Sequence, residues 1–578
     1  MKYTQQEICC KYLTLIYHIT PTINHSLINK KNSLILPTKK PPMHENLLLI
    51  LGLLFSVFLL VMLAQRFKVA YPIFLVIAGL GISLIPEVPR VKLDPELIFL
   101  IFLPPLLYEA AWYTSWKDFW KWKRPIGLLA FGLVFFTSTV VAYSSVSLIP
   151  HFTLAMGFLL GGIVSPPDAV AAATVLKGMK VPHRILTILE GESLVNDASS
   201  LIVFRFALAA IITGSFSLHE ATGQFFIVTF MGIVVGLAGA HVMYLIHRFL
   251  PTTAAIDAGL TVMTPYILFL AAEHFHYSGV MAVVSGGLFI SYRSHEIFQT
   301  GHTRINMLGV WTTLIFAMNA LVFILIGLSL PEIIEGLGES SIMEGIKYGL
   351  LISAIVIVLR FMWVYPATFI PRLLSKEISK EPNPTWRGAL VVSWAGMRGV
   401  VSLATALSIP VYISDEVLFP QRNLIIFITF VVIFVTLVFQ GLTLPFLIKW
   451  IDMPDIDGEM QEAEQQAGIQ LKLARTAATL IDVKYANEMK TNELISLYRK
   501  DLDNDIGILS AKLASFECLD TQKAEVEVYT KMLLEIYNAQ RKVLFSLRRE
   551  NAYTDGEIRK AEMQLALDET KINGNLHL

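Results

Sequence analysis

Thirteen apolar segments follow one another between residues 46 and 450, and this succession constrains the fold more than any other feature of the sequence. The segments are 16 to 30 residues long, and about 20 residues suffice for a helix to span the roughly 30 Å hydrocarbon core of a bilayer. The segments are 46–64, 69–86, 95–113, 125–149, 153–178, 187–213, 222–250, 257–275, 278–293, 307–331, 343–370, 386–410 and 420–449. The sequence therefore predicts an all-α polytopic membrane protein of about 13 transmembrane helices.

The composition excludes several classes of protein. Charged residues make up 16% of the chain, whereas a soluble protein carries about 25%. The formal net charge is zero, so no overall field attracts nucleic acid. We expect the lipid bilayer as the chain's environment, no nucleic-acid partner and no cofactor.

Lysine and arginine are distributed unevenly between the loops. Alternate loops hold sixteen of them, and the other loops hold only Arg90, Lys92, Lys347 and Arg422. Because cytoplasmic loops carry the excess of positive charge, we expect the N-terminus outside and the C-terminal tail in the cytoplasm. The membrane would then be the plasma membrane of the cell.

Two terminal regions flank the predicted membrane domain, 43–450. Residues 1–42 hold six lysines and one acid, which conflicts with an outer location. Since Met43 stands directly before the first span, our hypothesis is that translation starts there, and that 1–42 are a disordered extension or lie upstream of the true start. Residues 451–578 show helical spacing of apolar side chains from about 459 and again near 522–549, and predict a helical cytoplasmic tail.

Two adjacent prolines interrupt the fifth segment in the stretch SPPDAVA (165–171). Pro166 and Pro167 remove two backbone donors and clash with the preceding turn, which predicts a broken helix near mid-membrane. Such backbone is tolerated only where it is buried in protein or lines a cavity. Asp168 follows the break directly. Because an ionisable group at this depth costs about 2.5–3.5 kcal/mol, we interpret Asp168 as functional rather than as a simple cap beside a proline kink.

The sixth segment carries a polar face in the stretch LEGESLVNDASSL (189–201). Ser193 and Asp197 are four residues apart and Asn196 is three from Ser193, so the three share one helix face. Glu192 flanks that face. Together they offer the oxygen ligands that a hard cation prefers. The alternative is a polar stripe that joins helices, which rarely needs two carboxylates.

The twelfth segment holds a deep arginine between two glycines. Gly396 and Gly399 flank Arg398 in the stretch GMRGVVSLA (396–404), which predicts a second interrupted helix. A buried guanidinium must be compensated, and its partner is either Glu192 or the carbonyl ends of the broken helices. Two interrupted segments in comparable positions of the two halves indicate a transporter site. Three further charges lie inside predicted spans at less certain depth: Glu109, Arg205 and Arg360.

These motifs resemble those of monovalent cation/proton antiporters, the family of the bacterial NhaP-type and the NHE-type sodium/proton exchangers. The matching stretches are SPPDAVA, LEGESLVNDASSL, GMRGVVSLA and, more weakly, FLPPLLYEAAW (102–112). The resemblance implies an inverted-repeat antiporter fold with two broken helices. It also implies a homodimer in which a core moves against a scaffold formed mostly by spans 1–3 and 7–10.

The resemblance assigns ion or proton binding to Asp168, Asp197, Ser193, Glu192, Asn196 and Pro167. Asp197 would be the principal carboxylate, and Na⁺ would bind at Asp168, Ser193 and Asp197. Asn196 would orient the site. Many members of the family carry Thr or Val at the position of Pro167, so here only a carbonyl is available. By the same resemblance, Arg398 would form a structural ion pair with Glu192.

The predicted function is secondary active exchange of Na⁺ for H⁺ in pH and sodium homeostasis, without enzymatic catalysis. A dehydrated cavity disfavours a charged carboxylate, so cation and proton compete for it. Because Asn196 is neutral, we expect one proton per cation and an electroneutral cycle. Exchange of K⁺ or Li⁺ is an alternative, and a cation channel is an alternative of a different class.

Overall fold

The computed structural model describes residues 43–85, 95–176, 179, 181–214, 218–298, 300–337, 342–374, 384–414, 417–451 and 459–515, with short helical pieces between 531 and 566. The predicted extension 1–42 lies outside these residues. Leu54–Leu578 form one compact unit, to which every contact discussed below belongs.

Thirteen helical spans occupy the described residues between 43 and 451, as the sequence predicted. The unbroken ones are α2 (Met43–Arg66), α3 (Tyr71–Ser83), α4 (Pro95–Tyr113), α10 (His183–Thr213), α11 (Leu218–Phe249), α12 (Ala254–His274), α13 (Gly279–Ile297), α14 (Gly301–Leu328), which continues into α15 (Leu330–Leu337), and α16 (Ile342–Leu374). Eight spans are long and apolar enough to cross a bilayer by length and composition alone. Several helices begin earlier than predicted, because their first turns are polar and extend beyond the apolar run.

Two spans contain π-helical turns that the sequence did not predict. One follows α5 (Trp116–Lys121) and consists of α6 (Lys123–Gly127), η1 (Leu128–Leu133) and α7 (Val134–Leu148). The other consists of α19 (Arg422–Phe434), η3 (Val435–Gln440) and α20 (Gly441–Ile451). A π-helical turn frees backbone carbonyls for other donors. In η1, the Ala130 carbonyl accepts from Ser199 Oγ at 2.6 Å, which joins this span to α10.

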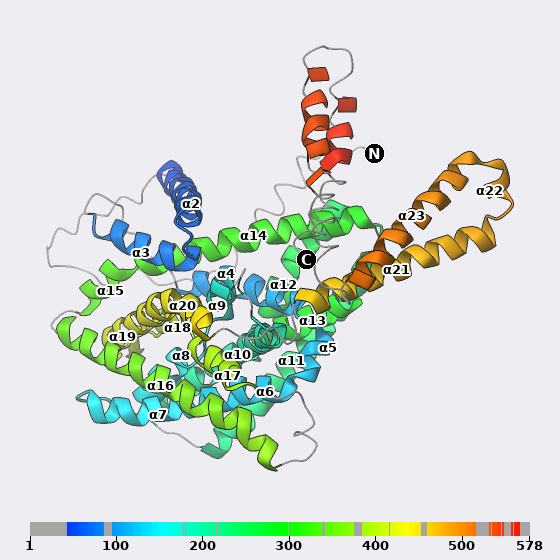
Figure 1. Cartoon of the computed structure of the whole chain (residues 1–578). Helices are drawn as coiled ribbons and strands as arrows, with labels where there is room; N and C mark the ends of the chain where they lie inside the picture. The colour runs from blue at the N-terminus through cyan, green and yellow to red at the C-terminus, as the bar shows by residue number, and fades with distance from the viewer. Residues whose placement is uncertain are drawn as a thin grey trace, which may run out of the picture. The chain divides into compact units, whose positions relative to one another are not determined.

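The two predicted broken helices are present. The first consists of α8 (Leu154–Val164) and α9 (Ala169–Leu176), and the second of α17 (Trp386–Trp394) and α18 (Val400–Leu407). Figure 1 shows α9, α10, α17 and α18 close together among the other membrane helices, and α10 contacts both α9 and α17.

Small residues allow the membrane helices to approach closely. A side chain at Gly157 or Gly161 of α8 would place its Cβ 2.6 Å from the carbonyl oxygen of Ala142 or Ser138 on α7. The spacing of four residues puts both glycines on one helix face, the small-xxx-small pattern of membrane helix pairs. This packing fixes α8, and with it the first break.

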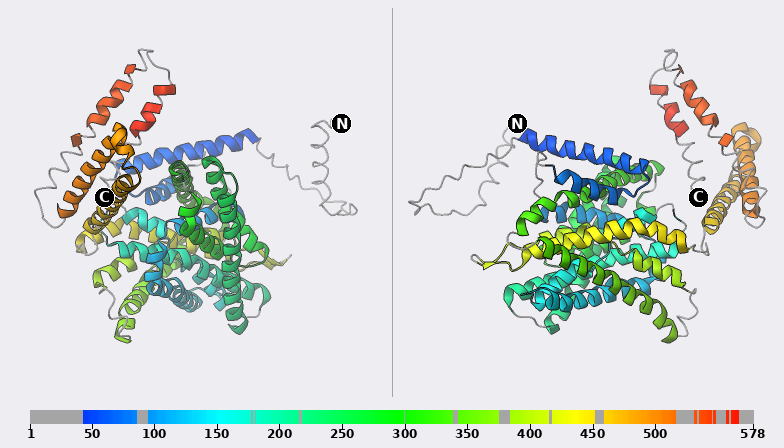
Figure 2. Two further views of the ribbon diagram at one scale, coloured as in Figure 1. Left: turned by 90° about the vertical axis from the view of Figure 1, so that its right-hand side faces the viewer. Right: turned by 60° about the vertical axis from the view of Figure 1, so that its left-hand side comes forward.

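The remaining elements are a short hairpin and the tail. Strands β1 (Tyr412–Ser414) and β2 (Val417–Leu418) pair antiparallel, a small exception to the all-α prediction. In the tail, α21 (Glu459–Lys484), α22 (Glu488–Thr491) and α23 (Glu493–Ser515) are helical, as predicted. Helices α21 and α23 lie side by side, drawn in orange in Figure 2.

Candidate functional site

The two helix breaks contact each other through the main chain. The backbone N–H of Asp168, in the first break, donates to the carbonyl of Met397, in the second, at 2.6 Å. Pro166 and Pro167 have no N–H, so the chain leaves the helix after the bond from Ser165 N–H to the Gly161 carbonyl. Each break therefore leaves backbone groups outside the helical hydrogen-bond pattern, and an N–H from the first break pairs with a carbonyl from the second.

Arg398 binds carbonyl groups at the ends of the broken helices. Its Nε donates to the carbonyl of Val164 at 3.0 Å, and Val164 is the last residue of α8. The guanidinium group also donates to the Gly396 carbonyl. Its own N–H donates to Thr436 Oγ1, in η3, at 3.1 Å. Arg398 is 1% exposed. A positive charge thus neutralises the partly negative carbonyl end of α8.

Glu192 pairs with Arg360, and the predicted ion pair between Glu192 and Arg398 is wrong. The two guanidinium nitrogens of Arg360 donate to the two carboxylate oxygens of Glu192 at 2.6 and 2.8 Å, with both side chains buried. Arg360 Nε donates to the Val392 carbonyl at 3.0 Å. Because both Glu192 oxygens bind one guanidinium, this carboxylate is a structural anchor between α10 and α16 rather than an obvious ion ligand.

The polar face of α10 is directed at the first break. Asn196 Nδ2 donates to the Pro167 carbonyl at 3.0 Å, and Ser193 Oγ accepts from the Ala169 N–H at 3.2 Å. Asp168 Oδ1 accepts from the Val170 N–H at 2.8 Å. Asp168 therefore caps α9, as the alternative reading of this residue expected, and its functional role stays a prediction.

A cavity of about 60 Å³ lies at the crossing, and Asp168, Ser193 and Asp197 line it. Asp197 is 7% exposed. Since a cavity needs about 10–15 Å³ of such space to hold one water molecule, this cavity has room for a cation together with a few water molecules. Gly399 also lines it, and a Cβ there would overlap the Asp168 carboxylate. Only glycine lets the second break approach that carboxylate so closely.

Two residues of the site were not identified as such from the sequence. Asn319 of α14 lines the same cavity and is 7% exposed. Its signal was a single amide within the apolar run of residues 314–328. Arg360 was noted only as a charge of uncertain depth, and its partner lies 168 residues away in the chain.

A second, larger cavity follows α10 beyond the site. It measures about 480 Å³, and its wall includes Ala198 and Leu201, immediately after Asp197. Arg205 and Glu273 form an ion pair of 2.8 Å in its wall, with Arg205 about half exposed. Among the described residues, the two cavities share none of those that line them, although Ala198 follows Asp197 directly in the chain.

Comparisons with known proteins show what the chain is similar to. A model of the family described as "Sodium/hydrogen exchanger, transmembrane" matches residues 52–450. The sodium, potassium, lithium and rubidium/H⁺ antiporter of Bacillus pumilus is 33% identical, covering 76% of this chain and 67% of its own length. The Na⁺/H⁺ antiporter ApNhaP of Aphanothece halophytica is 32% identical, covering 70% of this chain and 74% of its own.

A solved structure has the same fold. The sodium proton antiporter MjNhaP1 from Methanocaldococcus jannaschii superimposes with a TM-score of 0.55 at 17% sequence identity. The match covers 69% of this chain and 99% of that one. The predicted antiporter fold with two broken helices is thereby confirmed.

Proposed function

The chain belongs to the sodium/hydrogen exchanger family, and on this premise we propose that Na⁺ and H⁺ are exchanged where its two broken helices cross. The observation that carries the proposal is the pair of carboxylates, Asp168 and Asp197, that line one small cavity among the membrane helices. The protein is a multi-pass membrane transporter that exchanges a monovalent cation for protons.

Charge repulsion explains why the cation and the proton compete. Two carboxylates that face one small cavity inside the protein repel each other strongly, because the protein around them screens charge less than bulk water does. A bound cation relieves this repulsion, and so does protonation. When the cation or the proton is bound, the repulsion between the carboxylates is already relieved, so the other species binds more weakly. The site therefore carries the cation and the proton alternately, in opposite directions, without ATP.

The residues around the two carboxylates supply the other oxygen atoms. Ser193 Oγ lines the cavity, and Na⁺ would bind there together with Asp168 and Asp197. The hydrogen bond from Asn196 to the Pro167 carbonyl holds the break against α10. The Asn196 Oδ1 atom is buried with no hydrogen-bond partner among the described residues, so it is available to a protonated carboxyl or a hydrated ion.

Further parts of the proposal rest on the family and on the sequence. The named activity of the Bacillus pumilus relative covers sodium, potassium, lithium and rubidium, so we expect Na⁺ to be one of several alkali ions carried. We also propose a homodimer in the plasma membrane, with the N-terminus outside and the tail in the cytoplasm. The cycle would be electroneutral, because Asn196 adds no charge, and would need neither a cofactor nor a catalytic residue.

Proton flux in proteoliposomes tests the function. The purified full chain is reconstituted with a pH-sensitive dye inside, and Na⁺, Li⁺ or K⁺ is added outside. We expect cation-dependent proton flux that Asp197→Asn or Asp168→Asn abolishes, while Glu332→Gln, an exposed carboxylate on α15, leaves it unchanged. Cation flux without proton countertransport would indicate a channel, and full exchange in Asp197→Asn would refute the assigned site.

A further inference from the structure

Two neutral polar side chains line the exchange cavity beside the residues already assigned to it. Asn319 comes from α14, and Ser402 comes from the first turn of α18. Asn319 is 7% exposed and Ser402 is 2% exposed. The wall of the cavity therefore holds polar side chains from α14 and α18 in addition to those of α10 and the first break.

Both side chains are buried without a hydrogen bond among the described residues. Ser402 Oγ has no partner there, although the hydroxyl of Thr405, on the same helix, donates to the Val401 carbonyl at 2.6 Å. None of the described residues forms a hydrogen bond with the amide group of Asn319 either. Because native proteins pair nearly all of their buried polar groups, an unpaired one that faces a cavity points to a function.

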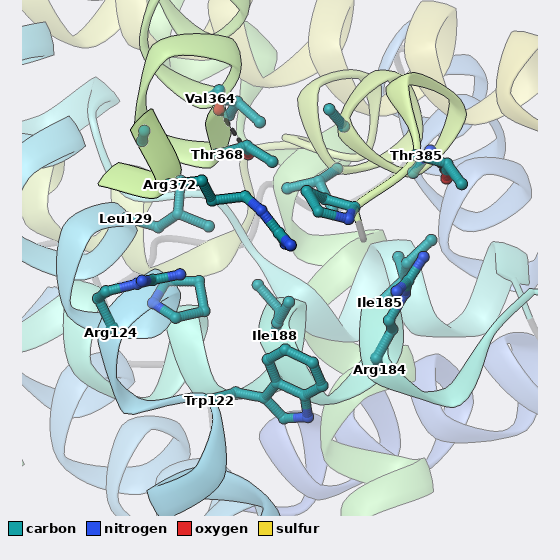
Figure 3. Close-up of a pocket in the computed structure, with 16 residues that line it drawn as sticks. Trp122, Arg124, Leu129, Arg184, Ile185, Ile188, Val364, Thr368, Arg372 and Thr385 are labelled. Atoms are coloured by element: carbon teal, nitrogen blue, oxygen red, sulfur yellow. Dashed lines mark hydrogen bonds between the residues drawn. The ribbon is translucent and has the colours of Figure 1, made fainter. Parts of the chain in front are cut away.

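Polar side chains that line another cavity of the membrane domain are paired. Figure 3 shows the cavity between α6, α10 and α16, where Thr368 Oγ1 donates to the Val364 carbonyl of its own helix at 2.7 Å. The cationic side chains of that cavity also have partners, namely Arg124, Arg184 and Arg372. The unpaired state of Asn319 and Ser402 is therefore not a general property of cavity walls in this chain.

The surroundings of Asn319 leave it little else to bind. Phe323, one helical turn further along α14, lines the same cavity, and so do Leu103 and Leu107 of α4. Among the described residues of α14 in this wall, Asn319 is thus the polar one. A side-chain amide inside a membrane helix is costly unless it has a partner, so its place in the wall of an ion site favours a role in binding.

We propose that the amide oxygen of Asn319 and the hydroxyl oxygen of Ser402 are two further ligands of the transported cation. This inference rests on the proposed function and extends it. An alkali cation leaves water only where oxygen atoms of the protein replace its hydration shell. Asp168, Ser193 and Asp197 supply part of such a shell, and Asn319 and Ser402 add two neutral oxygen atoms to it.

The neutral ligands serve the cation and not the proton. A proton binds to a single carboxylate oxygen, whereas a cation needs several oxygen atoms at once. Loss of a neutral ligand therefore weakens cation binding while both carboxylates can still take up a proton. The KM for the cation should rise and the maximal rate should persist, because a saturating cation concentration compensates for weaker binding.

The Na⁺ dependence of proton flux in proteoliposomes that contain the full chain tests the proposal. The test variants are Asn319→Leu and Ser402→Ala, and Asn319→Ala is measured as well in case the leucine variant does not fold. The matched controls are Thr313→Val on α14 and Thr405→Val on α18, whose hydroxyl groups bond to carbonyls of their own helices. Ser402→Ala removes one oxygen atom and adds nothing, so it disturbs packing least.

We expect each test variant to raise the KM for Na⁺ at least about fivefold and to keep the maximal rate within about twofold. The controls should keep both values within about twofold. A test variant with the natural KM would overturn the assignment of that residue, and so would a lower maximal rate at an unchanged KM. An equal rise of KM in the controls would overturn both assignments.

Failure of this inference is distinguishable from failure of the proposed function. Absence of cation-dependent proton flux in the natural chain would refute the function itself. Exchange in the natural chain that Asp197→Asn abolishes, together with a natural KM in Asn319→Leu and Ser402→Ala, would refute the two additional ligands alone.

Discussion

Removing the guanidinium group of Arg360 should destabilise the protein more than almost any other single substitution in the membrane domain. In Arg360→Met, the Glu192 carboxylate stays in a site where it is 0% exposed, with no partner to replace the two hydrogen bonds of 2.6 and 2.8 Å. Breaking a buried ion pair in this way costs about 3–5 kcal/mol, because one charge remains desolvated.

A second substitution, at Glu192, isolates the energy of the interaction between Glu192 and Arg360 from the other effects of losing Arg360. Glu192→Gln in the Arg360→Met background removes the stranded charge, so the double variant should recover much of the loss. The interaction energy from this double-mutant cycle should lie near the upper end of the usual range of about 0.5–3 kcal/mol. The same cycle with Arg398→Met should give a value lower by at least about 1 kcal/mol, because Arg398 binds the Val164 carbonyl instead.

The measurement is unfolding in one detergent at one pH, followed by tryptophan fluorescence and by the monodisperse fraction in size-exclusion chromatography. Arg360→Lys serves as the conservative variant, since it keeps the charge but cannot bind both carboxylate oxygens and the Val392 carbonyl together. A stronger coupling of Glu192 to Arg398 than to Arg360 would refute the assignment of the pair.

Three further perturbations test other parts of the structure. Gly399→Ala should lower proton flux at least about tenfold without unfolding the chain, because the new methyl group displaces the Asp168 carboxylate; normal flux would contradict the close approach. Asn196→Asp adds a titratable group beside the cavity, so exchange should begin to depend on an imposed membrane potential in proteoliposomes; a potential-independent variant would contradict the electroneutral explanation. In the tail, the hydrogen bonds and charge of Arg499 hold the pKa of Asp482 below its ordinary value. The stabilisation from this ion pair is therefore fully present above the ordinary pKa of an aspartate and is lost as the pH falls through the lowered pKa of Asp482. Arg499→Gln should therefore bring the pKa of Asp482, followed by NMR titration of its carboxyl group, back up toward the ordinary value, and an unchanged titration would exclude this pair as the cause of the lowered pKa.

The sequence predicted the membrane helices and the two breaks because their signals are local. Apolar runs set the spans, and the Pro166–Pro167 pair and the glycines around Arg398 interrupt the backbone wherever they occur. The face shared by Ser193 and Asn196 depends only on helical spacing, and the structure adds that both side chains bind the first break. The two carboxylates were likewise recognisable as charges far from any predicted loop.

The partners of the two deep arginines depended on tertiary packing. The family resemblance paired Arg398 with Glu192, yet Arg360 approaches that carboxylate from α16, where no nearby residue signals the contact. Residue spacing alone had left the carbonyl ends of the broken helices open as an alternative for Arg398, and these are what it binds. The π-helical turns were also invisible in advance, because η1 and η3 have the same apolar composition as the helices around them.

The bond from the Asp168 N–H to the Met397 carbonyl has an evolutionary consequence. Both of its atoms belong to the main chain, so every amino acid except proline at position 168 can form it. The main-chain contact between the breaks is therefore independent of which side chain stands at position 168, so the chemistry of that side chain can change while this contact is kept.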